Sequence, residues 1–188
     1  MIFWPFIAEQ EGRRSIGYVP PEGDSGVTIG MGIDLGQMPQ SAFDALPMGL
    51  QLTLRPYLGL TRSRAEAALE RFPLHLSPAE LDALEQPTKA RIVGALSAHY
   101  LADSGVPFPS LPDAAQTVMA SVTWQYGATW ERCPHFWGAC VARDWPQVHH
   151  ELLHFGDAYG PRRAREAAYL ADNLPADLVP QPIPRPTS

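Results

Sequence analysis

A short stretch near the N-terminus carries carboxyl and hydroxyl groups at spacings that suit acid–base chemistry. Glu11 is expected at the C-terminal end of a short helix, where the negative end of the helix dipole disfavours an ionised carboxylate. Thr28 and Asp34 flank Gly30 and Gly32, whose alternation on a strand would leave one face bare for a ligand. One protonated carboxyl, one ionised carboxyl and a hydroxyl form a glycosidase-like set. The plainer interpretation is a surface acid, an Asx turn and a strand-forming threonine.

The second candidate is the pentapeptide His-Glu-Leu-Leu-His at residues 150–154. On a helix, His150 and His154 lie one turn apart on one face, as in zinc peptidases, with Glu151 as the general base. The third ligand is missing from the expected spacing, where Asp157 and Gly160 stand. A zinc-dependent peptidase is therefore the alternative function, and a partly buried histidine without metal is the simpler explanation.

The elements that must position the first group of residues are a helix and a hairpin. Pro5 suits the first turn of a helix that reaches Glu11, and Gly12 suits its end. The β-branched run 27–29 and the turn residues before it predict a small β-hairpin with 20–26 as its loop.

From about residue 40 onward the pattern is helical. Capping boxes begin at Ser63 and Ser77, and Pro87 suits another helix start, which would bury Ile92 and Leu101. The remaining predicted helices span residues 111–126, 144–155 and 161–173. The fold class is therefore α+β, with a small N-terminal sheet and a larger helical body.

Composition and charge exclude several classes of protein. The 188 residues include 14 basic and 20 acidic residues, a formal net charge of −6, and no long basic stretch, so a nucleic-acid partner is not expected. No apolar run is long enough for stable membrane insertion. Cys133 and Cys140 are expected on or beside one helix, too far apart for a disulfide, and so to be two thiols. The proline-rich segment 175–188 is expected to be an extended tail.

The motif residues resemble a known family. Glu11-Gly-x-Arg-x-x-x-Tyr18, followed by Thr28-Ile-Gly-x-Gly, resembles the signature of phage-type lysozymes. These muramidases cut the β-1,4 bond between N-acetylmuramic acid and N-acetylglucosamine. The string 25–37, with Asp-Leu-Gly after the glycines, is similar to the pesticin-like branch, which includes bacteriocin and effector domains.

The resemblance implies a fold and a set of catalytic roles. It implies one lysozyme-like domain over residues 1–174, with a catalytic hairpin lobe at 1–60 and a helical lobe at 61–174. Glu11 would be the general acid and Thr28 would position the attacking water. For the base, the resemblance favours Asp34, with Asp24 as the alternative.

The resemblance also implies residues that bind or support. Tyr18 and Gly30 would contact the substrate from the hairpin. Gln125 and Tyr126 belong to a stretch that resembles part of the helical lobe and would also contact the substrate. Arg163 lies in a Pro-x-Arg-Ala stretch and would hold Glu11.

The expected setting follows from the same resemblance. The substrate would be peptidoglycan glycan strands, and neither cofactor nor metal is implied. The first residues do not resemble a signal peptide. The protein is therefore expected to be made in the cytoplasm and to act in the periplasm or at the cell wall after release or injection. It would serve as an endolysin or an antibacterial effector, with a lysis partner or an immunity protein. A non-catalytic wall-binding domain is a further alternative.

Overall fold

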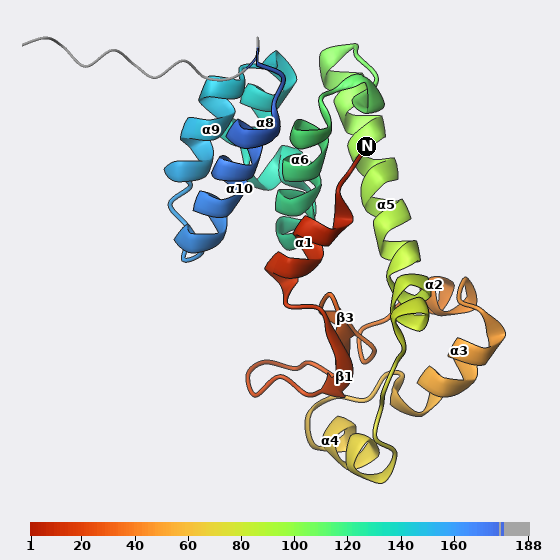
Figure 1. Ribbon diagram of the computed structural model, residues 1–188. Helices are drawn as coiled ribbons and strands as arrows, with labels where there is room; N and C mark the ends of the chain where they lie inside the picture. The colour runs from red at the N-terminus through yellow and green to blue at the C-terminus, as the bar shows by residue number, and fades with distance from the viewer. Residues whose placement is uncertain (177, 179–188) are drawn as a thin grey trace, which may run out of the picture. The chain divides into compact units, whose positions relative to one another are not determined.

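The computed structural model describes residues 1–176 and 178, and its chain divides into two compact units (Figure 1). The hairpin unit is Ala8–Arg91, and the helical unit is Met1–Ile7 with the chain from Ile92 onward. The division falls inside two helices, α1 (Trp4–Glu11) and α5 (Pro78–Ser104). It differs from the predicted lobes 1–60 and 61–174, because the chain between 61 and 91 contributes to the core of the hairpin unit.

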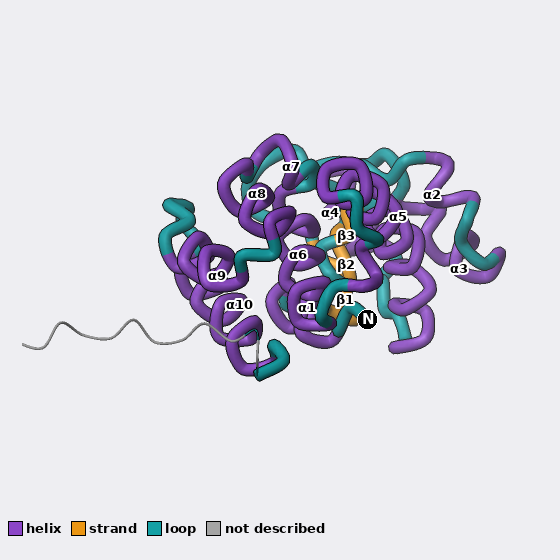
Figure 2. The backbone as a smooth tube through the Cα atoms, turned by 90° about the horizontal axis from the view of Figure 1, so that it is seen from above, coloured by secondary structure: helices purple, strands orange, loops and turns teal. Residues whose placement is uncertain are grey.

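The hairpin unit is built on one antiparallel sheet of three strands (Figure 2). Strands β1 (Arg14–Tyr18), β2 (Thr28–Gly30) and β3 (Ile33–Asp34) lie in chain order. The predicted hairpin is confirmed, and its loop joins β1 to β2. The third strand escaped prediction because two residues are too few to show an alternating pattern.

The outer edge of β1 is covered by the chain at 74–76. Gly17 donates its N–H to the carbonyl of Leu74 at 3.0 Å, and Leu76 donates to Ser15 at 3.0 Å. A Cβ at Gly17 would lie 3.1 Å from the Leu74 Cβ, so a glycine allows this close approach. The covered edge is protected from pairing with another chain.

Short helices surround the sheet and close the apolar core of the hairpin unit. They are α2 (Gln40–Asp44), α3 (Met48–Leu54), the 3-10 turn η1 (Arg55–Tyr57) and α4 (Arg62–Arg71). Ile29 of β2 and Leu35, which follows β3, pack with Leu54 of α3 and Leu81 of α5, and all four side chains are buried. The predicted capping box at Ser63 is wrong, because α4 begins at Arg62 and Thr61 is its N-cap residue.

Helix α5 runs without interruption from Pro78 to Ser104 and contains Pro87, so the predicted helix start at Pro87 is wrong. A proline in a helix removes one backbone hydrogen bond and costs about 3 kcal/mol. Burial of apolar side chains before and after it, such as Leu84 and Ile92, offsets that cost. Tyr100, rather than the half-exposed Leu101, occupies the buried face.

The start of α5 matches its sequence signal. Ser77 donates its N–H to Glu80 at 2.8 Å and its hydroxyl to the same carboxylate at 2.7 Å, while the Glu80 N–H donates back at 3.3 Å. The capping box predicted here is therefore confirmed. These hydrogen bonds lower the pKa of Glu80.

The helical unit is organised around α6 (Asp113–Tyr126), where every residue from Ala114 to Thr123 is buried. Its other elements are the 3-10 turn η2 (Phe108–Ser110), α7 (Thr129–Arg132), α8 (Pro134–Ala142), α9 (Trp145–Leu153) and α10 (Gly160–Asn173). Helix α10 packs on both α6 and α9, and α8 packs on α9 (Figure 1). The three helices predicted in this region are confirmed to within two residues at each end.

Cys133 is the N-cap residue of α8, and Cys140 lies within that helix. Both are buried free thiols, as expected from their spacing. Burial raises the pKa of both thiols. The α+β class is also confirmed.

Among the described residues, none of the helices combines the length and apolar character needed to cross a bilayer. Most of the segment for which a proline-rich tail is predicted, residue 177 and residues 179–188, lies outside the described residues.

Candidate functional site

Glu11 stands at the last position of α1, as its sequence context predicts. Gly12 follows in the left-handed conformation, with φ of 63°. The N–H groups of Gly12 and Arg13 donate to the carbonyls of Glu9 at 3.3 Å and Ala8 at 3.2 Å, which closes the helix. The Oε1 atom of Glu11 is buried.

Three of the predicted site residues form one row across the sheet. Thr28 pairs with Tyr18 of β1 on one side and with Asp34 of β3 on the other. Residues that pair directly across antiparallel strands present their side chains on the same face. Thr28 is buried, and its hydroxyl donates to the carbonyl of Gly26 at 3.3 Å, which leaves the oxygen lone pairs as acceptors.

The Asp34 carboxylate is held by the backbone of the loop. Its Oδ1 accepts hydrogen bonds from the N–H of Gly26 at 3.0 Å and of Gly36 at 2.8 Å. These two glycines approach closely, since a Cβ at Gly26 would lie 2.7 Å from the Gly36 Cα. Both hydrogen bonds use the same oxygen, and they fix the orientation of the carboxylate.

Asp24, the alternative base, has a different environment. It lies in the loop between β1 and β2, its side chain is 77% exposed, and it forms an ion pair with Arg62. Tyr18, at the end of β1, is covered by the guanidinium of Arg14, which lies 4.3 Å from the ring centroid. Of the two carboxylates, Asp34 is the one that the sheet brings beside Thr28.

The prediction that Gly30 and Gly32 alternate on a bare strand is wrong. Strand β2 ends at Gly30, and Gly32 lies in the turn that follows, both with positive φ of 63° and 81°. A Cβ at Gly30 would lie 2.9 Å from Oε1 of Glu85, so this side chain occupies the space beside the glycine.

Glu85 was missed by the sequence analysis. It is fully buried, its Oε1 accepts from Nε of Arg13 at 2.9 Å, and its Oε2 accepts from Nζ of Lys89 at 2.9 Å. Burial lowers the pKa of Arg13, but its ion pairs with Glu85 and Asp82 outweigh burial and raise it. The available signal was its spacing, four residues after Leu81 and seven before Ile92, which places a charge on the apolar face of α5.

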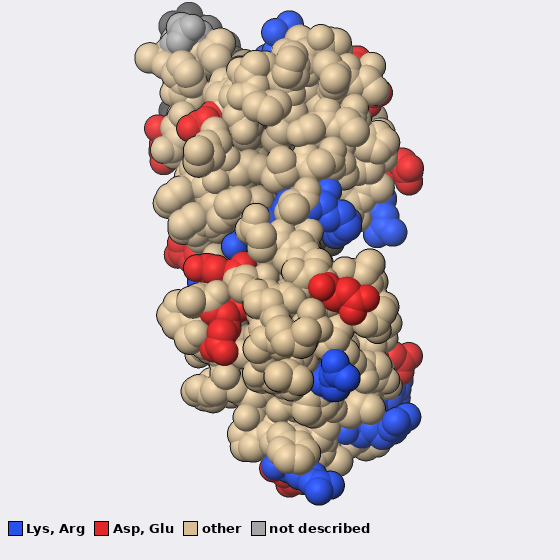
Figure 3. Space-filling view, turned by 90° about the vertical axis from the view of Figure 1, so that its right-hand side faces the viewer, with Lys and Arg blue, Asp and Glu red and all other residues tan. Residues whose placement is uncertain are grey.

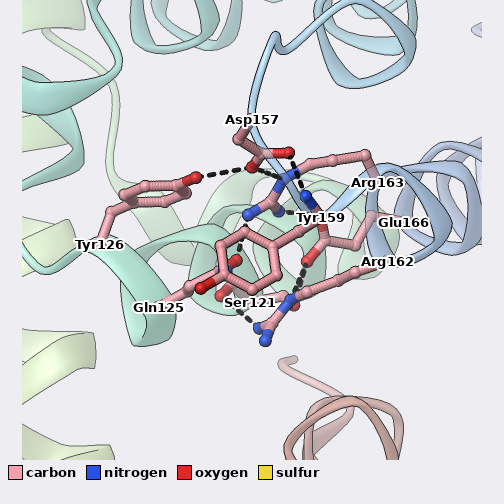
Figure 4. A network of polar contacts seen from close by, with 8 residues as sticks. All are labelled: Ser121, Gln125, Tyr126, Asp157, Tyr159, Arg162, Arg163 and Glu166. Carbon is pink, nitrogen blue, oxygen red and sulfur yellow. Dashed lines mark hydrogen bonds and ion pairs between the residues drawn. The ribbon is translucent and has the colours of Figure 1, made fainter. Parts of the chain in front are cut away.

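In the helical unit, Gln125, Tyr126 and Arg163 are brought together in one polar network (Figure 4). Arg163 donates from Nε to Asp157 at 2.9 Å, and its other nitrogens donate to Glu166 and Gln125. The hydroxyl of Tyr126 donates to the same Asp157 oxygen at 2.6 Å. The network joins the end of α6 to the start of α10.

Glu166 and Arg162 extend this network into the interior of the helical unit. Glu166 accepts from the Ser121 hydroxyl at 2.5 Å and from Nε of Arg162 at 3.1 Å. With Arg163 and Asp157, the cluster contains two cations and two anions, so its buried charges are balanced.

The ionisation of this cluster follows from its contacts. Burial alone would raise the pKa of Asp157, but hydrogen bonds from Tyr126 and Arg163 outweigh it and lower the pKa. Burial lowers the pKa of Arg163, but the charges of Glu166 and Asp157 outweigh it and raise the pKa. The guanidinium also lies over the Phe155 ring, 4.6 Å from its centroid. That Arg163 holds Glu11 stays a prediction.

His150, on α9, and His154, which follows the last residue of that helix, are both exposed. Their rings stack with centroids 4.1 Å apart, and Nδ1 of His154 lies 2.9 Å from the carbonyl oxygen of His150. The expectation that His154 is partly buried is wrong, because it follows the last residue of α9. Within the described part of the chain, no group of three or more histidine, cysteine or acidic residues is placed to hold a metal ion. The third ligand that a catalytic zinc site requires is therefore not among them.

Comparison with known protein families agrees with the fold and with the family resemblance. No curated protein matches the chain. The family model described as pesticin, a bacterial toxin homologue of phage lysozyme, C-terminal, matches residues 2–146. The match includes the whole hairpin unit and agrees with a lysozyme-like α+β fold. Since it spans most of the sequence, the chain belongs to the pesticin family of phage-lysozyme homologues.

Proposed function

We propose that the protein is a muramidase that hydrolyses the β-1,4 bond between N-acetylmuramic acid and N-acetylglucosamine in peptidoglycan. The observation that carries the proposal is the row of Tyr18, Thr28 and Asp34 across the sheet, in the same unit as Glu11. Membership of a family of phage-lysozyme homologues supports it. Most glycoside hydrolases use a pair of carboxyl groups that flank the bond they cut.

The proposed mechanism assigns one step to each group. Glu11 donates its proton to the glycosidic oxygen as the bond from that oxygen to the anomeric carbon breaks. A water molecule attacks the anomeric carbon and gives its proton to the Asp34 carboxylate. The Thr28 hydroxyl, whose hydrogen is donated to Gly26, accepts a hydrogen bond from that water and orients it.

The proposed setting follows from the substrate. Peptidoglycan lies outside the cytoplasmic membrane, so the protein would act in the periplasm or at the wall. The same reaction would suit an endolysin, whose partner would be a lysis protein, and an antibacterial effector, whose partner would be an immunity protein. The family description as a bacterial toxin homologue favours the effector role.

Replacement of Glu11 by glutamine tests the proposal. The change keeps the shape of the side chain but removes the acidic proton of the carboxyl group. Clearing of a purified peptidoglycan suspension should therefore fall by at least about 100-fold. Glu9→Gln is the matched control, because Glu9 is an exposed acid on the same helix and should keep full activity. Circular dichroism establishes that both variants are folded. Clearing by Glu11→Gln at the wild-type rate would rule the proposal out.

A further inference from the structure

We propose that Glu85 is a positioning residue for the reaction: it holds the end of α1 that carries Glu11 against the turn that follows Thr28. The inference rests on the proposed function, because it concerns the geometry between the proposed acid and the residue that orients water. Glu85 itself would touch neither the sugar nor the water.

The first observation is that Glu85 is a fully buried carboxylate with two cationic partners. Arg13 and Lys89 each bind a different oxygen, both at 2.9 Å. Lys89 is the chain's sole lysine. A buried charge without a partner is strongly disfavoured, so loss of the Glu85 charge would leave Arg13 and Lys89 to find new positions.

The second observation is the short link from Glu85 to Glu11. Arg13 follows Glu11 by two residues, and the intervening Gly12 is fixed by the hydrogen bonds that close α1. The planar guanidinium of Arg13 also bonds Asp82, at 2.6 Å, so both of its partners lie on α5. A shift of Arg13 would therefore be passed directly to the last turn of α1.

The third observation is the short link from Glu85 to Thr28. Gly30 follows Thr28 by two residues on β2, and its Cα faces Oε1 of Glu85 so closely that a Cβ would be only 2.9 Å away. Gly30 is also the pairing partner of Arg14, next to Arg13, so both links meet at the same point of the sheet. Glu85 thus lies beside Arg13 and Gly30, and each of these is two residues along the chain from a group with a proposed catalytic role.

Such an arrangement controls reaction rate more than substrate affinity. A misplacement of about 1 Å between reacting groups can cost about 100-fold in rate. Because Glu85 is fully buried and would touch neither the sugar nor the water, its replacement removes no group that binds the substrate. We expect Glu85→Gln to lower kcat at least ten-fold and to change KM by less than about two-fold.

The matched control is Asp82→Asn. Asp82 binds the same arginine from the same helix, but its side chain is 68% exposed and none of its atoms is among the three nearest to a Cβ at Gly30. This variant should keep both kcat and KM within about two-fold of wild type. Arg13→Lys is a second test, because it keeps a cation beside Glu85 but loses the planar guanidinium whose Nε fixes the Glu85 carboxylate. It should fold and lose kcat in the same direction as Glu85→Gln.

Thermal unfolding and NMR spectra of amide groups separate positioning from loss of fold. In folded Glu85→Gln, the amide signals of both 11–14 and 28–30 should shift, whereas Asp82→Asn should leave 28–30 in place. If wild type is inactive on peptidoglycan, the proposed function fails, and the NMR spectra still test the coupling. Wild-type kcat in folded Glu85→Gln, or a shift confined to one of the two segments, would overturn the inference. If Glu85→Gln does not fold, wild-type kcat in Arg13→Lys overturns it.

Discussion

Buried carboxylates lie beside cationic side chains in each of the two units. Glu85 is bound by Arg13 and Lys89 in the hairpin unit, and Glu166 by Arg162 and Arg163 in the helical unit. The cost of removing charge from water is offset only when partners are close and well oriented. Removing one member of either group should therefore be more damaging than removing an exposed ion pair.

For single residues of the candidate site, the sequence predicts some and gives no sign of others. Glu11, Thr28 and Asp34 could be found because their order and the glycines between them form a local pattern. Glu85 could not be assigned a role, because its partner Arg13 lies far away in the sequence and only folding brings the two together. The same holds for Asp157, in the loop before α10, and for Glu166 on α10, since their partners Tyr126 and Ser121 lie on α6.

The first residue-scale prediction concerns the base. In Asp34→Asn the amide oxygen can still accept from Gly26 and Gly36, so the loop is preserved while proton acceptance is lost. The rate of peptidoglycan hydrolysis should fall by at least about 100-fold. Asp24→Asn should retain its rate within about three-fold, because Asp24 is an exposed partner of Arg62. The reverse pattern in steady-state assays would assign the base to Asp24.

The second residue-scale prediction concerns stability in acid. The pKa of Asp157 is lower in the folded protein than its ordinary value, so its contribution is present above about pH 4 and is lost as pH falls through the folded pKa. Asp157→Asn should therefore be less stable than wild type at neutral pH, with the difference shrinking below about pH 4. Urea unfolding across this range measures it. An equal difference at every pH would refute the assignment to Asp157.

At the scale of elements, local signals predicted most starts and ends. The capping box at Ser77 and the glycines after α1 and α6 act through neighbouring residues, so the sequence alone reveals them. The helix start assigned to Pro87 failed because burial along α5 overrides a local preference against proline. The close approach of Gly26 to Gly36 is a tertiary contact that no local pattern shows.

The element-scale prediction uses that close approach. A Cβ at Gly26 would lie 2.3 Å from the carbonyl oxygen of Leu60, so Gly26→Ala must displace the loop that holds Asp34. We expect a loss of about 3 kcal/mol in the free energy of unfolding. Gly94→Ala, in open space on α5, should instead stabilise the protein by about 0.5–1 kcal/mol. Chemical denaturation compares the two, and a tolerated Gly26→Ala would contradict the packing described.

At the scale of the whole molecule, acidic residues outnumber basic ones. The net charge is −6, and on the face drawn in Figure 3 acidic and basic groups are interspersed among uncharged residues. Family membership rests on residues 2–146, which include the motif residues of the hairpin unit but not Arg163. Because the net charge is negative, recognition of a glycan strand would depend on sugar contacts more than on attraction to anionic wall polymers.

This leads to a prediction about ionic strength. An acidic protein gains no long-range attraction to anionic wall polymers, so salt screening has little to remove. The rate of peptidoglycan hydrolysis should change by less than about two-fold between about 50 and 200 mM sodium chloride. A steep fall in rate over this range would show that charge attraction drives binding.

The bond that is cut and the acid that assists its cleavage define the proposed activity. Mass spectrometry of the soluble products from purified peptidoglycan tests both at once. Wild type should release fragments that end in reducing N-acetylmuramic acid, and Glu11→Gln should release none above the level without enzyme. Fragments that end in reducing N-acetylglucosamine, cleaved stem peptides, or undiminished release by Glu11→Gln would contradict the proposed muramidase activity.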